Sequence, residues 1–554
     1  MPTTLRQIRP ALSAPGARPA LGALALALLV AAPAVVLAQE TTTDVTTDVV
    51  QYDDGSFYEG EIREGRRHGK GTLRTPNGYE YTGTFVEGEI RGEGIARFPN
   101  GSVYEGGFAA GRPHGLGKVT YPDGTVYEGD WVDGQINGSG RVAYATGFIY
   151  EGAFRAGEHH GKGRLESPSG SVYDGAWNMG VKEGAGKLTE ADGTVYTGAF
   201  KAGKPDGLGT LVSPDGTTYE GGWQQGRMHG AGRLTFPDGS VYDGPFAEGL
   251  RTGQGKITYA SGDVYIGDFV ADKRSGQGTL TGTDGYKYEG SWVDGQRDGN
   301  GTETYANGAV YTGQFRAGLP DGGGELTKPD GSTYVGGFRD GVFEGRGQRI
   351  WADGTSYEGG FVAGLFEGQG VRKLADGTTY EGSFRAGLYS GPGKLVAADG
   401  TVVYEGDFAN GLYEGQGTLK APDGYMYTGG WLGGKEHGQG MATYQDGTTY
   451  EGAFENGLRH GQGLAIYPDG SRISDTWVEG VAQSMLGETA APPAEPQTSP
   501  AAPQTLPAAP QAQPAEPQTP PAAPQAQPAE PQTPPAAPQT LPAEAPALPP
   551  QPAQ

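Results

Sequence analysis

The chain of 554 residues contains no cysteine. This absence excludes disulfide bonds, thiolate metal sites, cysteine nucleophiles and lipid attachment through a cysteine. Apolar residues make up only 35% of the sequence, whereas glycine accounts for 102 residues and proline for 41. A deep three-dimensional core is therefore not expected, and a thin, repetitive core is.

Only one apolar run is long enough to span a membrane. Three arginines precede the run LGALALALLVAAPAVVLA, from Leu21 to Ala38, and Val36 and Ala38 lie at the −3 and −1 positions of a cleavage site. This pattern predicts that residues 1–38 are a secretory signal peptide. The alternative is an uncleaved N-terminal membrane anchor, because a run of this length just suffices to cross. Both alternatives predict an exported protein, located in the periplasm or cell envelope or secreted.

Basic residues are also scarce: 41 Lys and Arg stand against 65 Asp and Glu, which gives a net charge of −24. Such a surface repels nucleic acids and anionic lipid heads, although a local basic patch is not excluded. A nucleic-acid partner is therefore not expected. The sequence contains no pattern that predicts a cofactor or a metal.

The dominant feature of the chain is an internal repeat. A tyrosine recurs every 23 residues in eighteen copies, and one extra residue, the second valine of TVVY, precedes the sixteenth. A nineteenth start is degenerate, since Ile473 stands in place of the tyrosine. The repeat tyrosines are Tyr58, Tyr81, Tyr104, Tyr127, Tyr150, Tyr173, Tyr196, Tyr219, Tyr242, Tyr265, Tyr288, Tyr311, Tyr334, Tyr357, Tyr380, Tyr404, Tyr427 and Tyr450.

Most glycines occupy fixed positions in the repeat. With the tyrosine as position 0, glycine occupies +2, +11, +13 and +20 in all copies, and +7 in all but the one where Asp272 replaces it. A phosphate-binding glycine loop would be unique in the chain. A glycine that recurs in every repeat indicates instead a requirement of the backbone.

The remaining positions predict one β-hairpin per repeat. Position +4 is Phe or Trp in every copy but the first, which has Ile62, so positions 0, +2 and +4 share one face of an extended strand. Position +15 is apolar in most copies and defines a second strand with the glycines at +11 and +13. A glycine-containing turn such as VDGQINGSG (132–140) would join the strands, and a type I turn such as PDG would follow. Aromatic residues at +4 that are expected to form the structural ladder with the tyrosines include Phe108, Trp131, Trp177, Trp223, Trp292 and Trp431.

A single hairpin cannot bury its aromatic rings, so the hairpins must stack edge to edge. The expected fold is all-β: an elongated, single-layer antiparallel solenoid of about 36 strands, in which the rings lie across the glycines of the paired strand. The strand twist should coil this sheet, and the TVVY insertion should form a β-bulge. The array would occupy residues 39–487.

The pattern YEGxFxxGxxxGxGxxxxxDG resembles the MORN (membrane occupation and recognition nexus) repeat family, over roughly Tyr52 to Gly480. The resemblance implies an elongated β-hairpin array that acts as a scaffold, often dimerises, and is associated with membranes and phosphoinositide heads. Some relatives carry a lipid kinase or methyltransferase domain, and this sequence contains no such region. The resulting expectation is an exported non-catalytic scaffold that binds protein partners, itself included. The alternative is a module that binds phospholipid heads or glycans.

Other recurring residues have structural interpretations. Six of the seven histidines occupy position +10 and are expected in an HG turn before the second strand: His68, His114, His160, His229, His437 and His460. Acidic residues at +1 and basic residues at +14 predict a cross-strand ladder of charges on the polar face. The aromatic ladder predicts packing, although an exposed part of it could bind glycans or flat ligands.

Residues 488–554 form a low-complexity segment rich in Pro, Ala and Gln, in which PAEPQTPPAAPQAQ recurs with a period of 14. It contains no aromatic residue and no Lys or Arg. This composition predicts a disordered, extended polyproline-type tail. A spacer is the preferred interpretation, and a ligand for a proline-recognising partner is the alternative.

Overall fold

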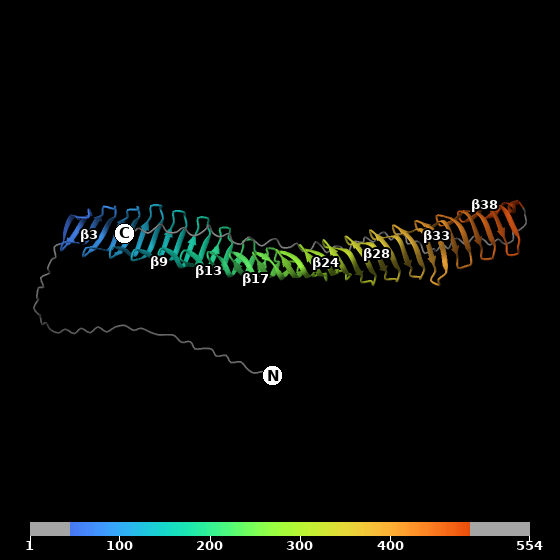
Figure 1. Ribbon diagram of the computed structural model, residues 1–554, viewed down its shortest axis with the longest axis horizontal. Helices are drawn as coiled ribbons and strands as arrows, with labels where there is room; N and C mark the ends of the chain where they lie inside the picture. The colour runs from blue at the N-terminus through green and yellow to red at the C-terminus, as the bar shows by residue number, and fades with distance from the viewer. Residues whose placement is uncertain (1–44, 488–554) are drawn as a thin grey trace, which may run out of the picture.

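The computed structural model describes residues 45–487 as one elongated antiparallel sheet of forty strands, followed by a short 3₁₀ helix (Figure 1). The predicted signal peptide, residues 39–44 of the predicted array and the predicted proline-rich tail lie outside the described residues. The described part of the chain contains no α-helix. The all-β hairpin array expected from the repeat is therefore confirmed.

The strands follow the repeat, with one strand of about seven residues and one of about nine in each copy. The first twenty are β1 (Thr46–Gln51), β2 (Phe57–Arg63), β3 (Arg66–Arg74), β4 (Glu80–Val86), β5 (Glu89–Arg97), β6 (Val103–Ala109), β7 (Arg112–Thr120), β8 (Val126–Val132), β9 (Gln135–Ala143), β10 (Ile149–Arg155), β11 (Glu158–Glu166), β12 (Val172–Asn178), β13 (Val181–Thr189), β14 (Val195–Lys201), β15 (Lys204–Val212), β16 (Thr218–Gln224), β17 (Arg227–Thr235), β18 (Val241–Ala247), β19 (Leu250–Arg251) and β20 (Gly253–Thr258).

The second half continues in the same way to the end of the array. Its elements are β21 (Val264–Val270), β22 (Lys273–Thr281), β23 (Lys287–Val293), β24 (Gln296–Thr304), β25 (Val310–Arg316), β26 (Leu319–Thr327), β27 (Thr333–Arg339), β28 (Val342–Ile350), β29 (Ser356–Val362), β30 (Leu365–Lys373), β31 (Thr379–Arg385), β32 (Leu388–Val396), β33 (Val402–Ala409), β34 (Leu412–Lys420), β35 (Met426–Leu432), β36 (Lys435–Thr443), β37 (Thr449–Glu455), β38 (Leu458–Ile466), β39 (Arg472–Val478), β40 (Val481–Ala482) and the 3₁₀ helix η1 (Gln483–Gly487).

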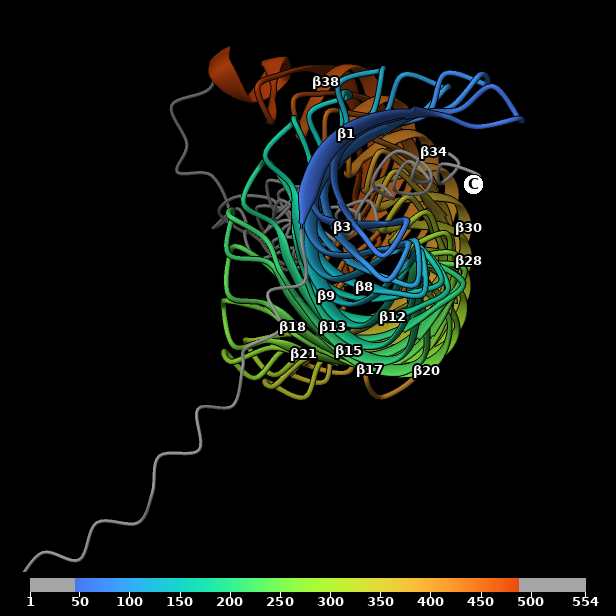
Figure 2. The same cartoon turned by 90° about the vertical axis from the view of Figure 1, so that its left-hand side faces the viewer.

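Each strand pairs with its neighbours in the chain, so the sheet order follows the sequence order. Forty strands at about 4.8 Å per strand give an array about 190 Å long. Seen along its axis, the sheet is curved and coils about its length (Figure 2). This coiling is the expected result of strand twist accumulated over many strands.

The sheet has four strands more than the 36 expected from eighteen hairpins. β1 precedes the first repeat, β39 and β40 form the degenerate nineteenth, and the second strand of the ninth repeat is divided into β19 and β20. The division lies opposite Pro245, whose carbonyl accepts a hydrogen bond from the Thr252 N–H at 3.0 Å. Pro245 has no N–H and cannot donate a ladder hydrogen bond, so the ladder is interrupted there.

The hairpin turn is shorter than expected. In the fourth repeat it consists of Asp133 and Gly134 alone, with φ of 49° and 83°, and β9 begins at Gln135. Positive φ at both residues defines a type I′ turn, which needs only the glycine at +7. The predicted loop over 132–140 is therefore wrong, because the glycine at +11 belongs to the strand, where Gly138 has a φ of 104° beside a register shift.

Two other local predictions are confirmed. In the PDG turn, Gly124 has a φ of 93° and its N–H donates to the Tyr121 carbonyl at 3.0 Å. At the TVVY insertion, Leu395 pairs with Tyr404 whereas Val396 pairs with Val402, so Val403 is the extra residue of a β-bulge.

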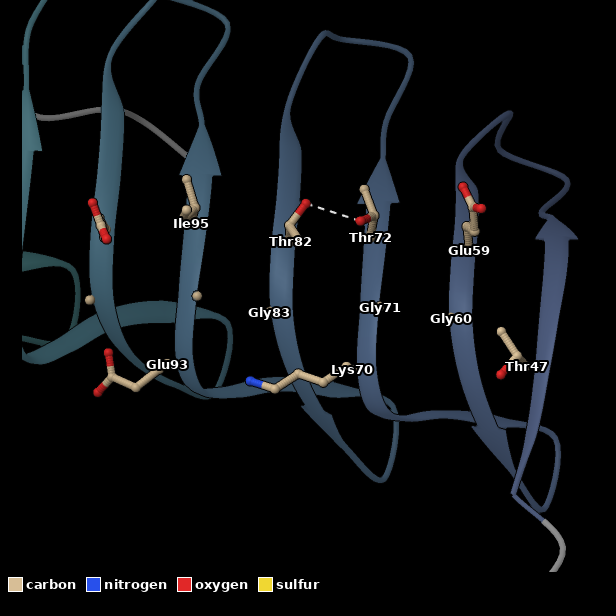
Figure 3. Close-up of a pocket in the computed structure, with 13 residues that line it drawn as sticks. Thr47, Glu59, Gly60, Lys70, Gly71, Thr72, Thr82, Gly83, Glu93 and Ile95 are labelled. Atoms are coloured by element: carbon tan, nitrogen blue, oxygen red, sulfur yellow. Dashed lines mark hydrogen bonds between the residues drawn. The ribbon is translucent and has the colours of Figure 1, made fainter.

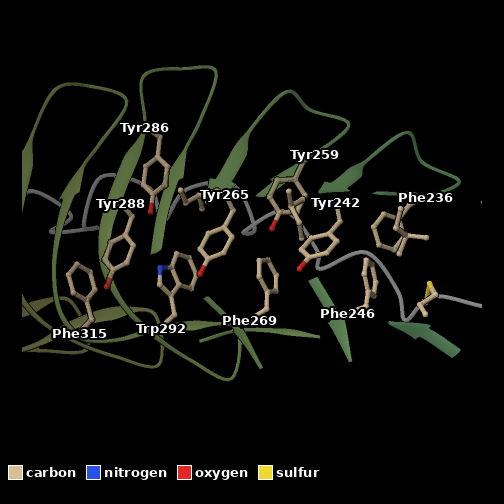
Figure 4. Packing of buried hydrophobic residues seen from close by; sticks show 14 of the residues in the cluster. Phe236, Tyr242, Phe246, Tyr259, Tyr265, Phe269, Tyr286, Tyr288, Trp292 and Phe315 are labelled. Atoms are coloured by element: carbon tan, nitrogen blue, oxygen red, sulfur yellow. The ribbon is translucent and has the colours of Figure 1, made fainter. Parts of the chain in front are cut away.

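The core is a continuous row of rings on one face of the sheet (Figure 4). The Tyr127 ring lies against Gly129 and Gly140, where a Cβ atom would fall 2.5 Å from its hydroxyl oxygen. Trp131 of the same repeat and Phe154 of the next meet this ring edge-on, at centroid distances of 5.7 and 5.1 Å. Each tyrosine is thus enclosed by glycines beneath it and by rings on both sides, which permits full burial in a one-layer sheet.

Candidate interaction surface

The structure places the predicted repeat aromatics in the core. The eighteen repeat tyrosines and the +4 residues Phe108, Trp131, Trp177, Trp223, Trp292 and Trp431 are all buried. Each repeat tyrosine also has a polar partner, as where the Tyr219 hydroxyl donates to the Gly222 carbonyl at 2.9 Å. Burial raises the pKa of Tyr219 to about 12. The expectation that part of this ladder is exposed to ligands is wrong for these rings, since none presents a face to solvent.

A further core position, +9, was not predicted from the sequence. Its side chain covers the repeat tyrosine from the side opposite the glycines: His159 stacks on Tyr150 at 3.6 Å and Phe343 on Tyr334 at 3.7 Å between ring centroids. Burial lowers the pKa of His159 to about 3. The period of two in the second strand places +9 on the same face as +11, +13 and +15, so this signal was present in the sequence.

In the middle of the array, position +9 holds buried arginines with acidic partners. The Arg251 side chain is 1% exposed, and its Nε donates to Asp272 Oδ1 at 3.0 Å. Farther along, the guanidinium of Arg297 contacts Glu303, and the Tyr286 hydroxyl donates to Glu303 at 2.9 Å. These groups bond to one another inside the core, although Arg251 Nη1, Asp272 Oδ2 and Arg297 Nε are buried without a hydrogen-bond partner, and because they are buried they offer no open site.

The opposite face of the sheet, termed the outer face, carries two rows of side chains. Positions +1 and +14 alternate along the first row, because Arg141 pairs with Glu128 of its own hairpin and with Glu151 of the next. This register confirms the predicted ladder of charges, and Arg233 reaches Asp243 at 3.3 Å within it. Positions +12 and +3 alternate along the second row.

Between these two rows lies a floor of bare backbone at +2 and +13, because any side chain at these positions would point to the core face, toward the repeat tyrosine. Near the N-terminal end of the array the floor and its borders form a shallow groove of about 690 Å³ (Figure 3). Thr72 and Thr82 are joined by a hydrogen bond of 3.0 Å on one border, and Lys70 donates to Thr84 at 2.9 Å on the other. The groove crosses several strands, so it suits a partner that lies along the array.

The +10 residues lie within the second strand, for example His114 in β7. The prediction that the histidines occupy a turn is therefore wrong, because the turn ends three residues earlier, at +7. The side chain at +10 accepts a hydrogen bond from the turn of the next repeat: the Asp133 N–H donates to His114 Nδ1 at 3.4 Å, and the Ala156 N–H to Asn137 at 2.8 Å. Over residues 45–487, no group of three or more His, Asp or Glu residues is placed to hold one metal ion.

The chain belongs to the MORN repeat family. The family model matches eighteen consecutive stretches between residues 58 and 472. Repeats of this family are protein- or lipid-interacting modules, and a chain that consists of repeats in this way is typical of a scaffold without catalysis.

A comparison with curated proteins gives no match. Among solved structures, the chain is similar to the TCP domain of SAS-4 from Drosophila melanogaster, with 18% identity over 33% of this chain and 97% of that one and a TM-score of 0.20. It is also similar to the TCP10 domain of CPAP from Danio rerio, with 15% identity over 53% of this chain and 96% of that one and a TM-score of 0.13. At these TM-scores neither likeness carries an argument about function.

None of the helical structure found between residues 45 and 487 is both long and apolar enough for a transmembrane helix.

Proposed function

We propose that the protein is an exported, non-catalytic scaffold that binds protein partners along the outer face of its repeat array. The observation that supports this function is the continuity of that face. Its two side-chain rows and glycine floor recur in every hairpin, whereas no repeat carries a distinct set of reactive residues among those described. Export rests on the signal-peptide pattern of residues 1–38.

The charge ladder gives the face a means of selecting partners. From Glu105 to Lys187 the first row alternates acidic and basic residues across successive strands. Alternating charges at fixed spacing favour a partner with the complementary pattern and disfavour others.

The proposal is tested by chemical crosslinking in intact cells, followed by identification of the partners by mass spectrometry. The wild-type chain is compared with Arg141→Glu, which places three acids side by side in the row. We expect the variant to lose partners that the wild type retains. The matched control is Arg155→Glu, an exposed arginine at the hairpin edge outside this row.

A lipid-head or glycan module is the competing function. Vesicles that contain anionic lipid and isolated cell-wall material separate the two. Saturable, salt-insensitive capture of the chain by either material, with no protein partner recovered from cells, would replace the scaffold by a lipid or glycan binder.

Self-association is part of the proposed function and is favoured at the N-terminal end of the array. Among residues 45–487, strand β1 pairs only with β2, and Val49 is 60% exposed on it. At the other end η1 follows β40, and the Ser484 N–H donates to Asp475 Oδ2 at 2.7 Å. Open edge strands promote pairing between chains. Light scattering should show an oligomer that Val49→Lys weakens and Leu116→Lys does not; a monomeric wild type would refute self-association.

A further inference from the structure

An exposed aliphatic row runs along the hairpin-turn edge of the outer face in the second half of the array. It is formed by positions +5 and +8, the two residues that flank the type I′ turn. Every repeat from the one with Leu250 to the degenerate one with Val478 has an aliphatic residue at one or both positions. Leu412, Leu432 and Leu458 are 44%, 53% and 38% exposed. We term these residues the edge row.

In the first half of the array, the eight repeats have an aliphatic residue larger than alanine at these positions only at Val86, Val132 and Val181. Position +8 holds Arg66, Glu89, Arg112, Glu158 and Lys204 there, among others. Since both halves share the same hairpin geometry, the fold does not require the leucines. A long exposed apolar strip on a soluble chain usually marks a contact surface.

We propose that the edge row is covered by the chain's own proline-rich segment, residues 488–554. The first support is where the array ends. Val481 in β40 is the last aliphatic residue at +8, and η1 follows it directly and ends at Gly487. The proline-rich segment therefore starts at the C-terminal end of the edge row.

The second support is a match of two spacings. Successive hairpins place their row residues about 9.6 Å apart, which is twice the strand separation. A polyproline II helix has three residues per turn and advances about 9.3 Å per turn. Between Pro493 and Pro538 a proline recurs every three or four residues. Because the steps of three and four residues alternate, the prolines advance about 10.9 Å on average, so the match of about one proline per hairpin holds over the first few hairpins and drifts beyond them.

Charge provides the third support. Residues 488–554 contain five acidic residues, Glu488, Glu495, Glu516, Glu530 and Glu544, and no Lys or Arg. Along the edge row the charged residues are mostly basic, namely Lys273, Arg316, Arg339, Arg385 and Lys435, with Glu455 as the acidic one. Lys273, Arg316 and Arg339 already form ion pairs with Asp294, Asp321 and Glu344, so the basic charge that complements an acidic, apolar segment lies around Arg385 and Lys435, near the C-terminal end of the row.

The absence of cysteine permits a direct test on the full chain. Ser499 lies 12 residues beyond Gly487, which corresponds to about 37 Å of polyproline II helix. Leu388 lies four hairpins before Val481, or about 38 Å along the array. The double variants Ser499→Cys/Leu388→Cys and Ser499→Cys/Leu458→Cys are oxidised under mild conditions, and the disulfides are mapped by mass spectrometry.

If the segment is docked, the Ser499→Cys/Leu388→Cys disulfide should form at least about tenfold faster than the Ser499→Cys/Leu458→Cys disulfide. Reaching Leu388 requires full extension of the 12 residues over about 37 Å, which docking maintains and a free chain rarely adopts. A free segment would prefer the nearer Leu458→Cys position. That preference would overturn the proposal, and so would the absence of both disulfides. Disulfides formed between two chains would also overturn it and would indicate that a second copy covers the edge row.

A further substitution separates docking from chance contact. Leu412→Glu places a carboxylate on the row between Leu388 and the end of the array, and we expect it to slow the Leu388→Cys disulfide by about tenfold. Leu208→Glu is the matched control, since Leu208 is 78% exposed in the first half of the array, outside the edge row. Equal rates in the two variants would contradict the contact.

Discussion

The ring of Tyr196 lies on the backbone of Gly209, so closely that a Cβ atom at Gly209 would fall 2.4 Å from the tyrosine hydroxyl oxygen and 2.6 Å from ring carbons. Gly209 is also paired on both sides in the sheet, with Gly198 in its own hairpin and with Gly221 in the next. The same contact recurs along the array. Glycine at +13 is therefore a steric requirement of the buried tyrosine.

Replacing Gly209 by valine should destabilise the array by about 3 kcal/mol, because the new side chain overlaps the Tyr196 ring. The matched control is Leu208→Val, at a side chain 78% exposed on the other face, which should change stability by less than about 0.5 kcal/mol. Thermal unfolding followed by circular dichroism measures both. Equal losses of melting temperature would contradict the glycine contact.

The type I′ turns hold residues other than glycine at +6 under backbone strain. Ala363 has a φ of 48°, a region that costs a residue with a Cβ atom about 1 kcal/mol. Ala363→Gly should therefore raise the free energy of unfolding by about 0.5–1 kcal/mol. Asn456→Gly is the control, with a φ of 55° that asparagine tolerates well, and it should have little effect. A loss of stability in Ala363→Gly would show that the turn is unstrained.

The buried pair Arg251–Asp272 replaces a simpler arrangement found one repeat earlier, where Met228 occupies +9 and Gly249 occupies the following +7. Arg251→Met and Asp272→Gly should each cost about 3–5 kcal/mol, because each leaves one buried charge without its partner. The double variant recreates the arrangement of the preceding repeat and should recover most of the loss. A double-mutant cycle from denaturant unfolding measures the coupling, and additive losses would contradict it.

Burial of the repeat tyrosines makes the stability of the fold sensitive to alkaline pH. The pKa of Tyr219 is raised to about 12 from an ordinary value near 10, so folding favours the protonated phenol. This contribution is fully present below pH 10 and is lost as the pH rises from 10 towards 12. Since the repeat tyrosines share this environment, we expect tyrosinate absorbance and loss of sheet signal to appear together above pH 10. Tyrosinate formation near pH 10 with an intact sheet would contradict the prediction.

The sequence determined the repeat unit because its constraints are local and recur many times. A period of two places Tyr, Gly and Phe or Trp on one face, and the glycines at +2 and +13 fix the pairing that puts a ring over bare backbone. From these features the hairpins, the single sheet, the charge ladder and the bulge beside Val403 could all be predicted. The turn length could not, because glycine at both +7 and +11 is compatible with a turn.

Only the tertiary structure decided which variable positions are buried and which side chains meet across repeats. Arg251 and Asp272 lie 21 residues apart and become partners because adjacent turns stack in the sheet. The stacking of His159 on Tyr150 likewise depends on the strand pairing that sets His159 opposite Phe154 in the hairpin. The edge row is also a tertiary property, since its members lie in successive repeats and come together along one edge when the hairpins align at the strand spacing.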